Sequence, residues 1–514
     1  MNFKKENLIN HIPLFVSLFV FFITTFNFNQ GVEFVDEGVL NMGAWRISEG
    51  QVPYRDFFIP YTPLSFYFLA FFYKIFGVSV ITGRLTAIFL SAIFIFSIYL
   101  LSKKTINNPL FASIPIIFLT QAGMVSWHFA SHHWLGNIFT IFSIYLALIF
   151  FETSAIKSLF FSAFAAGLTF ITITDQGFYN IVFLLILFFF FSPSNLKIKN
   201  LMIYLSGVLS SVLPLFLYLI IKVPLSTLFY DLVVFPLTGY KSIEGNKMGI
   251  FYPFKELLFV WKSGNFQYAP LWTAIASISS LLISLLPYLS VLSFIYLITK
   301  DKKAKLNYFL LFSGAMMMIL TAARRWAPIN LIWASSIPSI LISIALAKMF
   351  KSEKVIWKRI SFFCFIFLMS IFVIFGILRT ASLFDKTRNI EIKSKAGTIY
   401  LNNPYLASQF IGLLNAIEQL IPEKEQFLSK EISIVNFMTL RRNPTKIDFF
   451  KPPFYSPQKH IDSVIKDLED KNIRYIVSLN KELNEENPFD TYLSKKFTPI
   501  WQNKEFIIYK RAAS

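Results

Sequence analysis

The chain has 514 residues, of which 55% are hydrophobic and only 15% are charged, and its net charge is +19. A soluble globular protein carries roughly 25% charged residues, so this composition excludes a cytosolic enzyme and a disordered protein. The lone cysteine, Cys364, excludes an intramolecular disulfide and a cysteine metal cluster. Because the sequence has no strip of interleaved basic and aromatic residues, the positive charge does not predict nucleic-acid binding. The composition indicates an integral membrane protein.

Apolar runs occupy most of the chain before residue 380. A spanning helix needs about 20 mostly apolar residues, and runs of suitable length lie at 12–28, 81–101, 109–127, 134–151, 158–174, 178–192, 201–221, 271–299, 306–322, 328–347 and 360–378. We therefore expect a polytopic α-helical domain over residues 1–379 with about eleven transmembrane helices. The first run lacks a small-residue cleavage site, which favours a signal anchor over a cleaved signal.

Short lysine-rich links separate several of these runs. They contain Lys103 and Lys104, Lys197 and Lys199, Lys300 to Lys305, and Lys348 to Arg359. Basic links mark the cytoplasmic side of a membrane, and alternation from a cytoplasmic N-terminus places all of them inside. The links 29–80, 128–133, 222–270 and 323–327 then lie outside, as does everything after 379. This pattern predicts a multi-pass protein of the cytoplasmic (inner) membrane, in contact with membrane lipid.

The first outer link, residues 29–80, is unusually acidic. Of the 13 acidic residues before position 380, five lie in it: Glu33, Asp36, Glu37, Glu49 and Asp56. The stretches 40–50 and 61–77 within this link have the pattern of helices. If the second stretch crossed the membrane, the lysine-rich links that follow would lie outside, so we expect both helices to lie in the interface.

After Arg379 the composition becomes that of a small extracytoplasmic α/β domain, residues 380–514. Helical spacing and start signals predict helices at 403–422 and 456–472. Short runs rich in β-branched residues predict strands at 431–437 and 473–479, and the end of the chain predicts a hairpin around Gln502 and Asn503.

Asp36 and Glu37 directly follow the first predicted span. An ionised carboxylate at the edge of a bilayer is costly and is kept where water, cations or a function hold it. Desolvation raises a carboxyl pKa, which makes the group a better general base at neutral pH. The structural alternative is the N-terminus of a helix, where acidic residues are favourable. Spacing alone leaves both interpretations open.

The segment WHFASHHW, residues 127–134, holds three histidines on an outer link. His128 and His132 have the i, i+4 spacing that could face one metal ion on a helix, but no acidic third ligand is close in sequence. Contact of His128, His132 and His133 with a sugar or phosphate is therefore favoured. No cofactor is certain, and a divalent metal ion is left open.

Arg324 and Arg325 lie at the outer end of a predicted span. A guanidinium group suits bidentate recognition of phosphate, whereas snorkelling to lipid phosphates is the structural alternative. Asp175 interrupts an apolar region and needs a partner, either at the outer edge or inside the bundle. The sequence has no Gly-Lys phosphate loop, HExxH or GxSxG motif, which excludes an ATPase within this chain.

Residues 35–85 carry an ordered pattern over some fifty positions. It consists of Asp36 and Glu37, Gly50 with Pro53, Tyr54 and Asp56, Pro63 and Leu64, and Arg84. This pattern resembles the first outer loop of GT-C class membrane glycosyltransferases, in particular bacterial relatives of protein O-mannosyltransferases and lipid A aminoarabinose transferases. The layout of many spans followed by an outer α/β domain is similar as well. The stretch RRNPTKIDFF, residues 441–450, also resembles such proteins.

The resemblance implies transfer of a monosaccharide from a polyprenyl-phosphate donor to a hydroxyl of a protein, lipid or glycan acceptor. It implies a single displacement with inversion, in which Asp36, beside Glu37, acts as base or orients the nucleophile. Arg324 and Arg325 would stabilise the departing phosphate, and Arg84 would do so or would only lock helices together. We expect the substrates to contact Tyr54, Asp56, Tyr61, the three histidines and Asp175.

The sequence departs from the family pattern at two places. Relatives often carry Lys or Arg near the position of Asp175, and FFIPYTP stands where the aminoarabinose branch often has Glu-Lys-Pro-Pro.

Two other functions compete with glycosyl transfer. A transporter or flippase of a lipid-linked sugar would favour duplicated halves and charged or broken helices at mid-membrane. A non-catalytic envelope-assembly protein would use the outer domain for binding alone.

Overall fold

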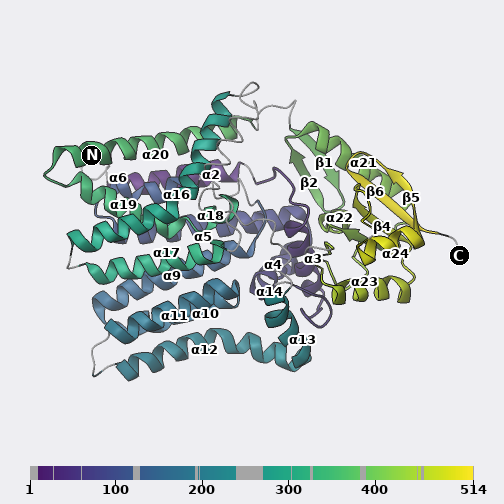
Figure 1. The fold of residues 1–514 in the computed structure, drawn as a ribbon, viewed down its shortest axis with the longest axis horizontal. Coiled ribbons are helices and arrows are strands. Elements are labelled where there is room, and N and C mark those ends of the chain that lie inside the picture. Colours follow the sequence, from purple (N-terminus) through teal and green to yellow (C-terminus); the bar gives the residue numbers. More distant parts are fainter. Residues whose placement is uncertain are drawn as a thin grey trace.

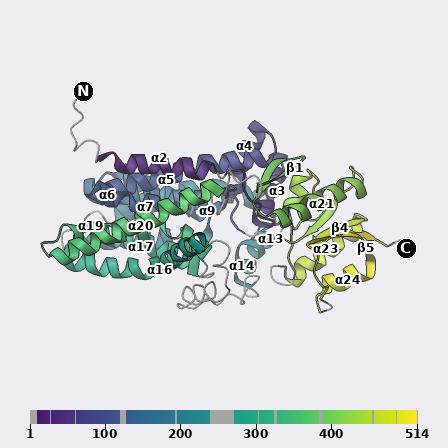
Figure 2. The same ribbon diagram turned by 90° about the horizontal axis from the view of Figure 1, so that it is seen from above.

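The structure, a computed structural model, describes residues 10–26, 28–59, 61–119, 128–191, 195, 197–238, 270–301, 304–323, 328–382, 389–448, 450–452, 456–484 and 486–512. A bundle of helices forms one part of the molecule, and a smaller α/β domain packs against one end of it (Figure 1; Figure 2). The predicted combination of a polytopic helical protein and a C-terminal α/β domain is confirmed.

The bundle consists of apolar helices that lie side by side (Figure 1). They are α2 (Ile12–Thr25), α5 (Val80–Thr105), α6 (Pro109–Ala112), α7 (Ile114–Ile117), α9 (His132–Thr153), α10 (Ile156–Phe170), α11 (Thr174–Phe191), α12 (Lys197–Lys222), α16 (Pro270–Lys300), α17 (Lys305–Ala323), α18 (Pro328–Trp333), α19 (Ser336–Phe350) and α20 (Val355–Ser382). Among the described residues, seven helices are long and apolar enough to cross a membrane. The helices α2, α10 and α19 are apolar but shorter, at 14, 15 and 15 residues.

The predicted span at 109–127 does not form one helix over its described part. It is divided into α6 and α7, two four-residue helices, and residues 120–127 lie outside the described residues. Pro109 begins α6 and Pro115 lies in the first turn of α7. Because proline lacks the amide hydrogen and its ring clashes with the preceding turn, Pro115 favours a helix start rather than a continuation.

The two ends of the bundle differ. Here the domain end is the end next to the α/β domain, where α9 begins at His132 and α11 begins at Thr174; the far end is the opposite one (Figure 1). At the far end, Lys104 pairs with Glu152 (N–O 2.6 Å) and Lys348 pairs with Asp301 (2.5 Å). The structure therefore brings the lysine-rich links that follow α5, α16 and α19 to one end of the bundle.

Short helices from two predicted outer links lie between the bundle and the α/β domain (Figure 1). They are α3 (Asp36–Ser48), α4 (Leu64–Phe76), α13 (Leu225–Phe229), the π-helical turn η2 (Tyr230–Val234) and α14 (Phe235–Thr238). The two helices expected in the first link are thus present. The Tyr73 hydroxyl of α4 donates to the Asn41 side-chain oxygen of α3 (2.9 Å), which fixes the two helices to each other.

The α/β domain contains a four-stranded sheet of order β3-β4-β6-β5 and a separate hairpin. Its elements are β1 (Ile390–Ser394), β2 (Gly397–Leu401), α21 (Pro404–Leu420), β3 (Phe427–Lys430), α22 (Ile434–Met438), α23 (Gln458–Asp470), β4 (Tyr475–Leu479), α24 (Pro488–Lys496), β5 (Phe497–Gln502) and β6 (Phe506–Arg511). The strands β3 and β4 are parallel, and the other neighbouring pairs are antiparallel. Both predicted helices, the strand at 473–479 and the terminal hairpin are confirmed.

The strand predicted at 431–437 is wrong. The strand of this region, β3, ends at Lys430, and residues 434–438 form the helix α22. A short run of buried apolar residues does not distinguish strand from helix by periodicity, and here tertiary contacts decide. The Ile434 amide donates to the Phe34 carbonyl (3.1 Å) and the Ser433 hydroxyl donates to the Val35 carbonyl (3.1 Å), so this segment pairs with the start of α3 rather than with a strand.

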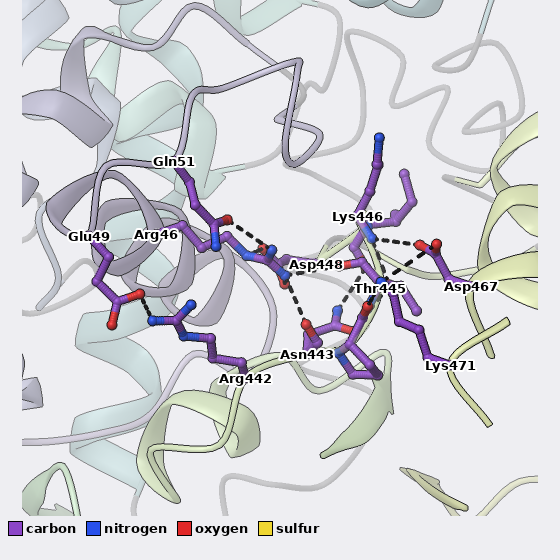
Figure 3. Close-up of polar contacts among 12 residues, drawn as sticks. Arg46, Glu49, Gln51, Arg442, Asn443, Thr445, Lys446, Asp448, Asp467 and Lys471 are labelled. Atoms are coloured by element: carbon purple, nitrogen blue, oxygen red, sulfur yellow. Dashed lines mark hydrogen bonds and ion pairs between the residues drawn. The ribbon is translucent and has the colours of Figure 1, made fainter. Parts of the chain in front are cut away.

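A buried ion pair joins the C-terminal half of α3 to the α/β domain (Figure 3). The Arg46 guanidinium contacts both Asp448 carboxylate oxygens, at 2.9 and 3.0 Å. It also donates to the carbonyls of Asn443 (3.1 Å) and Thr445 (2.9 Å). The Arg46 and Asp448 side chains are only 7% and 2% exposed, so water hardly reaches either charge. Each charge is therefore stabilised mainly by the other.

We predict that Asp448→Asn lowers the free energy of unfolding by about 3 to 5 kcal/mol, because it leaves the Arg46 charge buried without its counter-ion. The double variant Arg46→Met/Asp448→Leu removes both charges and should recover most of this loss. Thermal unfolding of the purified protein in detergent measures both effects, with the exposed Glu391→Gln as control. Equal stability of Asp448→Asn and wild type would show that the pair does not fix the domain.

Candidate functional site

Three residues of the predicted site meet in one buried cluster, although they come from separate segments of the chain. Glu37 lies in the first turn of α3, Arg84 lies in the first turns of α5, and His128 precedes α9. The Arg84 Nε and Nη2 atoms each lie 3.1 Å from Glu37 Oε1, and His128 Nε2 lies 3.1 Å from Glu37 Oε2. The side chains of Glu37 and Arg84 are each only 1% exposed.

The surrounding backbone completes this cluster. Arg84 also donates to the carbonyls of Gly31 (2.8 Å) and Phe28 (3.4 Å), and the Glu33 amide donates to Glu37 Oε2 (3.2 Å). Burial by itself raises the pKa of Glu37, but the charges of Arg84 and His128 outweigh it and lower this pKa to about 2. Glu37 is therefore an ionised carboxylate whose two oxygens both have protein partners.

Gly31 makes the close approach of His128 feasible. Its φ of +78° lies in the left-handed region, which a residue with a side chain seldom adopts. A Cβ atom at this position would lie 3.1 Å from His128 Cε1. A larger residue here would therefore strain the backbone and displace the imidazole from Glu37.

Asp36 is the first residue of α3 and is exposed, in contrast to its neighbour Glu37. The N-terminus of a helix carries a partial positive charge that stabilises an anion. The Glu33 carboxylate accepts the amide hydrogens of Val35 and Glu37, both at 3.0 Å, and so satisfies two amides at the start of this helix. The start of α3 thus combines a buried, ion-paired carboxylate with an exposed one.

Glu33 has an unusual titration because of its position. Burial raises its pKa, and the negative charge of Asp36 raises it further, to about 8, although hydrogen bonds from backbone amides oppose the change. The ordinary pKa of a glutamate is about 4.5. The protonation state of Glu33 near neutral pH is therefore linked to the charge of Asp36.

The opposite shifts of Glu33 and Glu37 predict a maximum in the stability of the protein. Between pH 4.5 and about 8 the folded protein retains a proton on Glu33 that the unfolded chain has lost, so stability falls as the pH rises through this window. Below pH 4.5, stability falls as the pH approaches 2, because Glu37 must be protonated against Arg84 and His128.

Unfolding temperatures measured across this pH range should fall on both sides of the maximum. The Glu33→Gln variant should lose only the fall on the high-pH side. If the unfolding temperature of Glu33→Gln fell on the high-pH side as that of wild type does, the assignment of this fall to Glu33 would be contradicted.

The first half of α3 rests directly on the α/β domain. Of the thirteen residues of α3, ten are buried. A Cβ atom on Gly38 would lie only 2.2 Å from the Ile434 amide nitrogen, so glycine permits the backbones of α3 and α22 to touch. Together with Arg46, this contact holds α3 between the bundle and the domain.

The other predicted ligands at the start of α9 form a row of rings. The centroid of Tyr61 lies 4.2 Å from that of His132, His132 lies 4.2 Å from His133, and His133 lies 5.4 Å from Trp333. His128 lies outside α9 and contacts Glu37, so His128 and His132 are not two positions of one helix face. Within the described part of the chain, no group of three or more His, Cys, Asp or Glu residues could hold a metal ion.

Tyr54 and Asp56 shape the loop between α3 and α4. The Asp56 carboxylate accepts the Val52 amide hydrogen (2.7 Å) and pairs with Arg55 (2.8 Å), which closes a tight turn. The Tyr54 hydroxyl donates to the Tyr61 carbonyl (2.8 Å). Asp56 thus stabilises the turn, and Tyr54 connects this loop to Tyr61 of the row of rings.

Asp175 lies in the first turn of α11 at the domain end, where its carboxylate accepts the Gln176 amide hydrogen (2.8 Å). The Gln176 side chain is buried and donates to the side-chain oxygens of Asn137 (3.0 Å) and Thr140 (2.8 Å). Sequence reasoning missed this polar network, because single Asn, Gln and Thr residues inside apolar runs give no distinctive signal. Arg324 and Arg325 lie outside the described residues.

Asp231 is a further carboxyl group that sequence reasoning did not select. It lies in the π-helical turn η2 and is 7% exposed. Burial raises its pKa to about 7, against the opposing charge of Lys459. Burial also raises the pKa of the Tyr54 hydroxyl, and the negative charge of Asp231 raises it further. An isolated acid in the apolar stretch LFYDLVVF was the available signal.

Comparison with known proteins identifies the fold. The family described as dolichyl-phosphate-mannose-protein mannosyltransferase matches residues 60–221. The crystal structure of ArnT from Cupriavidus metallidurans bound to undecaprenyl phosphate matches with a TM-score of 0.60 and 12% identity, over 98% of each chain. The apo structure of the same protein matches with a TM-score of 0.57 and 11% identity, over 98% of this chain and 97% of that chain. No curated protein matches the sequence.

The TM-scores and the coverage establish a shared fold over nearly the whole chain. The resemblance to GT-C class membrane glycosyltransferases related to protein O-mannosyltransferases and ArnT is confirmed. The chain is a multi-pass membrane protein.

Proposed function

We propose, from the fold shared with GT-C class membrane glycosyltransferases, that this protein transfers a monosaccharide from a polyprenyl-phosphate donor to an acceptor hydroxyl. The observation that carries the proposal is the start of α3, where the exposed Asp36 adjoins the buried cluster of Glu37, Arg84 and His128. The undecaprenyl phosphate bound to the similarly folded ArnT supports a polyprenyl-phosphate partner.

The reaction is a single displacement at the anomeric carbon. The acceptor oxygen forms a bond to this carbon while the bond from the carbon to the phosphate oxygen breaks, so the configuration inverts. The Asp36 carboxylate takes the proton of the acceptor hydroxyl, and the polyprenyl phosphate leaves with the electron pair of the broken bond. Because phosphate departs as a stable anion, the reaction needs cationic or hydrogen-bonding groups near it rather than a strong general acid.

Glu37, Arg84 and His128 position Asp36 in this mechanism. Since Arg84 already contacts Glu37 and two backbone carbonyls, we assign it to locking helices together rather than to binding the donor phosphate. Arg324 and Arg325 remain the proposed phosphate ligands, and the half-buried rings of Tyr61, His132 and His133 are proposed to contact the substrates.

The proposed orientation places the domain end of the bundle on the extracytoplasmic side of the inner membrane. It follows from the lysine-rich links at the far end, because basic links mark the cytoplasmic side. The N-terminus is then cytoplasmic, and residues 380–514 form the extracytoplasmic domain, while residues 1–379 form the catalytic membrane domain.

The direct test is Asp36→Asn in an in vitro transfer assay with radiolabelled polyprenyl-phosphate sugars and vesicles that supply acceptors. Loss of the general base should lower kcat about 10²- to 10⁴-fold, while the unfolding temperature and the donor Kd stay at wild-type values. The exposed Asp470→Asn of α23 is a matched control that removes a carboxylate from the same side of the protein.

Two outcomes would contradict this assignment. Equal transfer by Asp36→Asn and wild type would remove Asp36 from the mechanism. A loss confined to Asp231→Asn, tested in parallel, would assign the base to the buried acid of η2 instead.

Vesicles also test the competing transporter function. Translocation of a sugar-lipid across vesicles without acceptor would favour a transporter.

The positioning role of Arg84 has its own signature. Arg84→Lys removes the two-point contact with Glu37 and should lower kcat about 100-fold through misplacement of Asp36. It should leave the Kd for undecaprenyl phosphate unchanged, because the guanidinium does not touch the donor. A weaker Kd with an unchanged kcat would instead show that Arg84 binds the donor phosphate.

A further inference from the structure

A cavity of about 340 Å³ lies at the far end of the bundle, away from α3 and the α/β domain. Residues from the ends of α5, α9, α17 and α19, and from the links beside them, line it. The mechanism proposed above uses none of these residues.

The mouth of this cavity has a small excess of positive charge. Lys104, Lys348 and Lys351 line it together with the acidic residues Glu152 and Asp301, so three cations face two anions. Lys104 pairs with Glu152 (2.6 Å) and Lys348 pairs with Asp301 (2.5 Å). Lys351 is exposed and adds a third ammonium group beside these two pairs.

Part of the cavity lining is apolar, formed by the buried residues Leu148 of α9, Leu311 of α17, and Ile344 and Ala347 of α19. The polar residues Asn107, Asn307 and Tyr308 also line the cavity. The cavity therefore combines an ammonium-rich mouth with a hydrocarbon wall between helices. This combination suits a molecule with an anionic head and an apolar body.

We propose that this cavity binds the phosphate headgroup of an anionic phospholipid of the cytoplasmic leaflet. Basic pockets between transmembrane helices on the cytoplasmic side are typical sites for such headgroups. The sidedness of the site rests on the proposed orientation of the bundle, whereas its chemistry does not depend on glycosyl transfer.

Occupation of this cavity would connect helices that are far apart in the sequence. The phosphate would contact Lys351 and the ammonium groups of Lys104 in α5 and Lys348 in α19. A ligand that binds only the folded state stabilises it by mass action. The lipid would therefore hold the far ends of α5 and α19 together.

The test is a titration of the purified full-length protein with phosphatidylglycerol in phosphatidylcholine micelles, followed by native mass spectrometry. Removing one lysine near the phosphate should weaken the apparent Kd about fivefold, so Lys351→Gln should show this loss. The double variant Lys104→Gln/Lys351→Gln should show a larger one. Lys354→Gln removes the same charge from the same link outside the cavity and is the matched control.

The proposal is supported if wild type and Lys354→Gln retain phosphatidylglycerol and both Lys351 variants bind it more weakly. Equal binding by all four proteins, or an equal loss in Lys354→Gln, would overturn it, because the effect would then come from general surface charge. Saturation by inorganic phosphate in phosphatidylcholine micelles alone would overturn the lipid assignment in favour of a soluble anion.

These results are separable from the proposed transfer reaction. Asp36→Asn should bind phosphatidylglycerol as wild type does, because Asp36 lies at the other end of the bundle (Figure 1). The assay contains neither sugar donor nor acceptor, so the lipid site and the transferase activity can each fail alone.

Discussion

The burial of the Glu37 charge is the constraint on which the arrangement of the site depends. Taking a carboxylate out of water costs several kcal/mol, and only well-placed counter-charges and hydrogen bonds offset that cost. Here Arg84 and His128 supply the charges, and the backbone of the first link supplies an amide hydrogen. The position of α3 therefore depends on contacts among three separate segments of the chain. The same contacts leave Asp36, one residue earlier, at the exposed edge of the helix.

The second half of α3 is held in a comparable way, by the pair of Arg46 and Asp448 in the α/β domain. A helix of 13 residues is thus tied to the bundle near its start, through Arg84, and to the domain in both of its halves. In the proposed mechanism, the domain would limit how far the proposed base can move. A displacement of about 1 Å at a reacting group can cost roughly 100-fold in rate.

Much of this fold could be predicted from the sequence, since long apolar runs and capping signals are local. Asp36, Glu37 and Arg84 were selected together because they belong to one ordered pattern. Their geometry was not predictable, because contacts such as that of Arg46 with Asp448 join residues 402 positions apart. The run 431–437 was predicted as a strand, but its residues from Ile434 onward belong to the helix α22, because contacts with Phe34 and Val35 override the β-branched composition. Asp231 is an isolated acid in an apolar stretch, but its burial follows from the packing of η2 and is not predictable from the sequence.

The central claim, that a buried ionic cluster presents Asp36 at the outer aqueous edge of the membrane, can be measured by thiol labelling. In a Cys364→Ala background without native cysteines, Asp36→Cys and the buried Val39→Cys of the same helix are exposed in intact cells to a membrane-impermeant maleimide. The account predicts that the thiol at 36 is labelled without permeabilisation and the thiol at 39 is not. Labelling at 36 only after permeabilisation, or equal labelling at both positions, would contradict it.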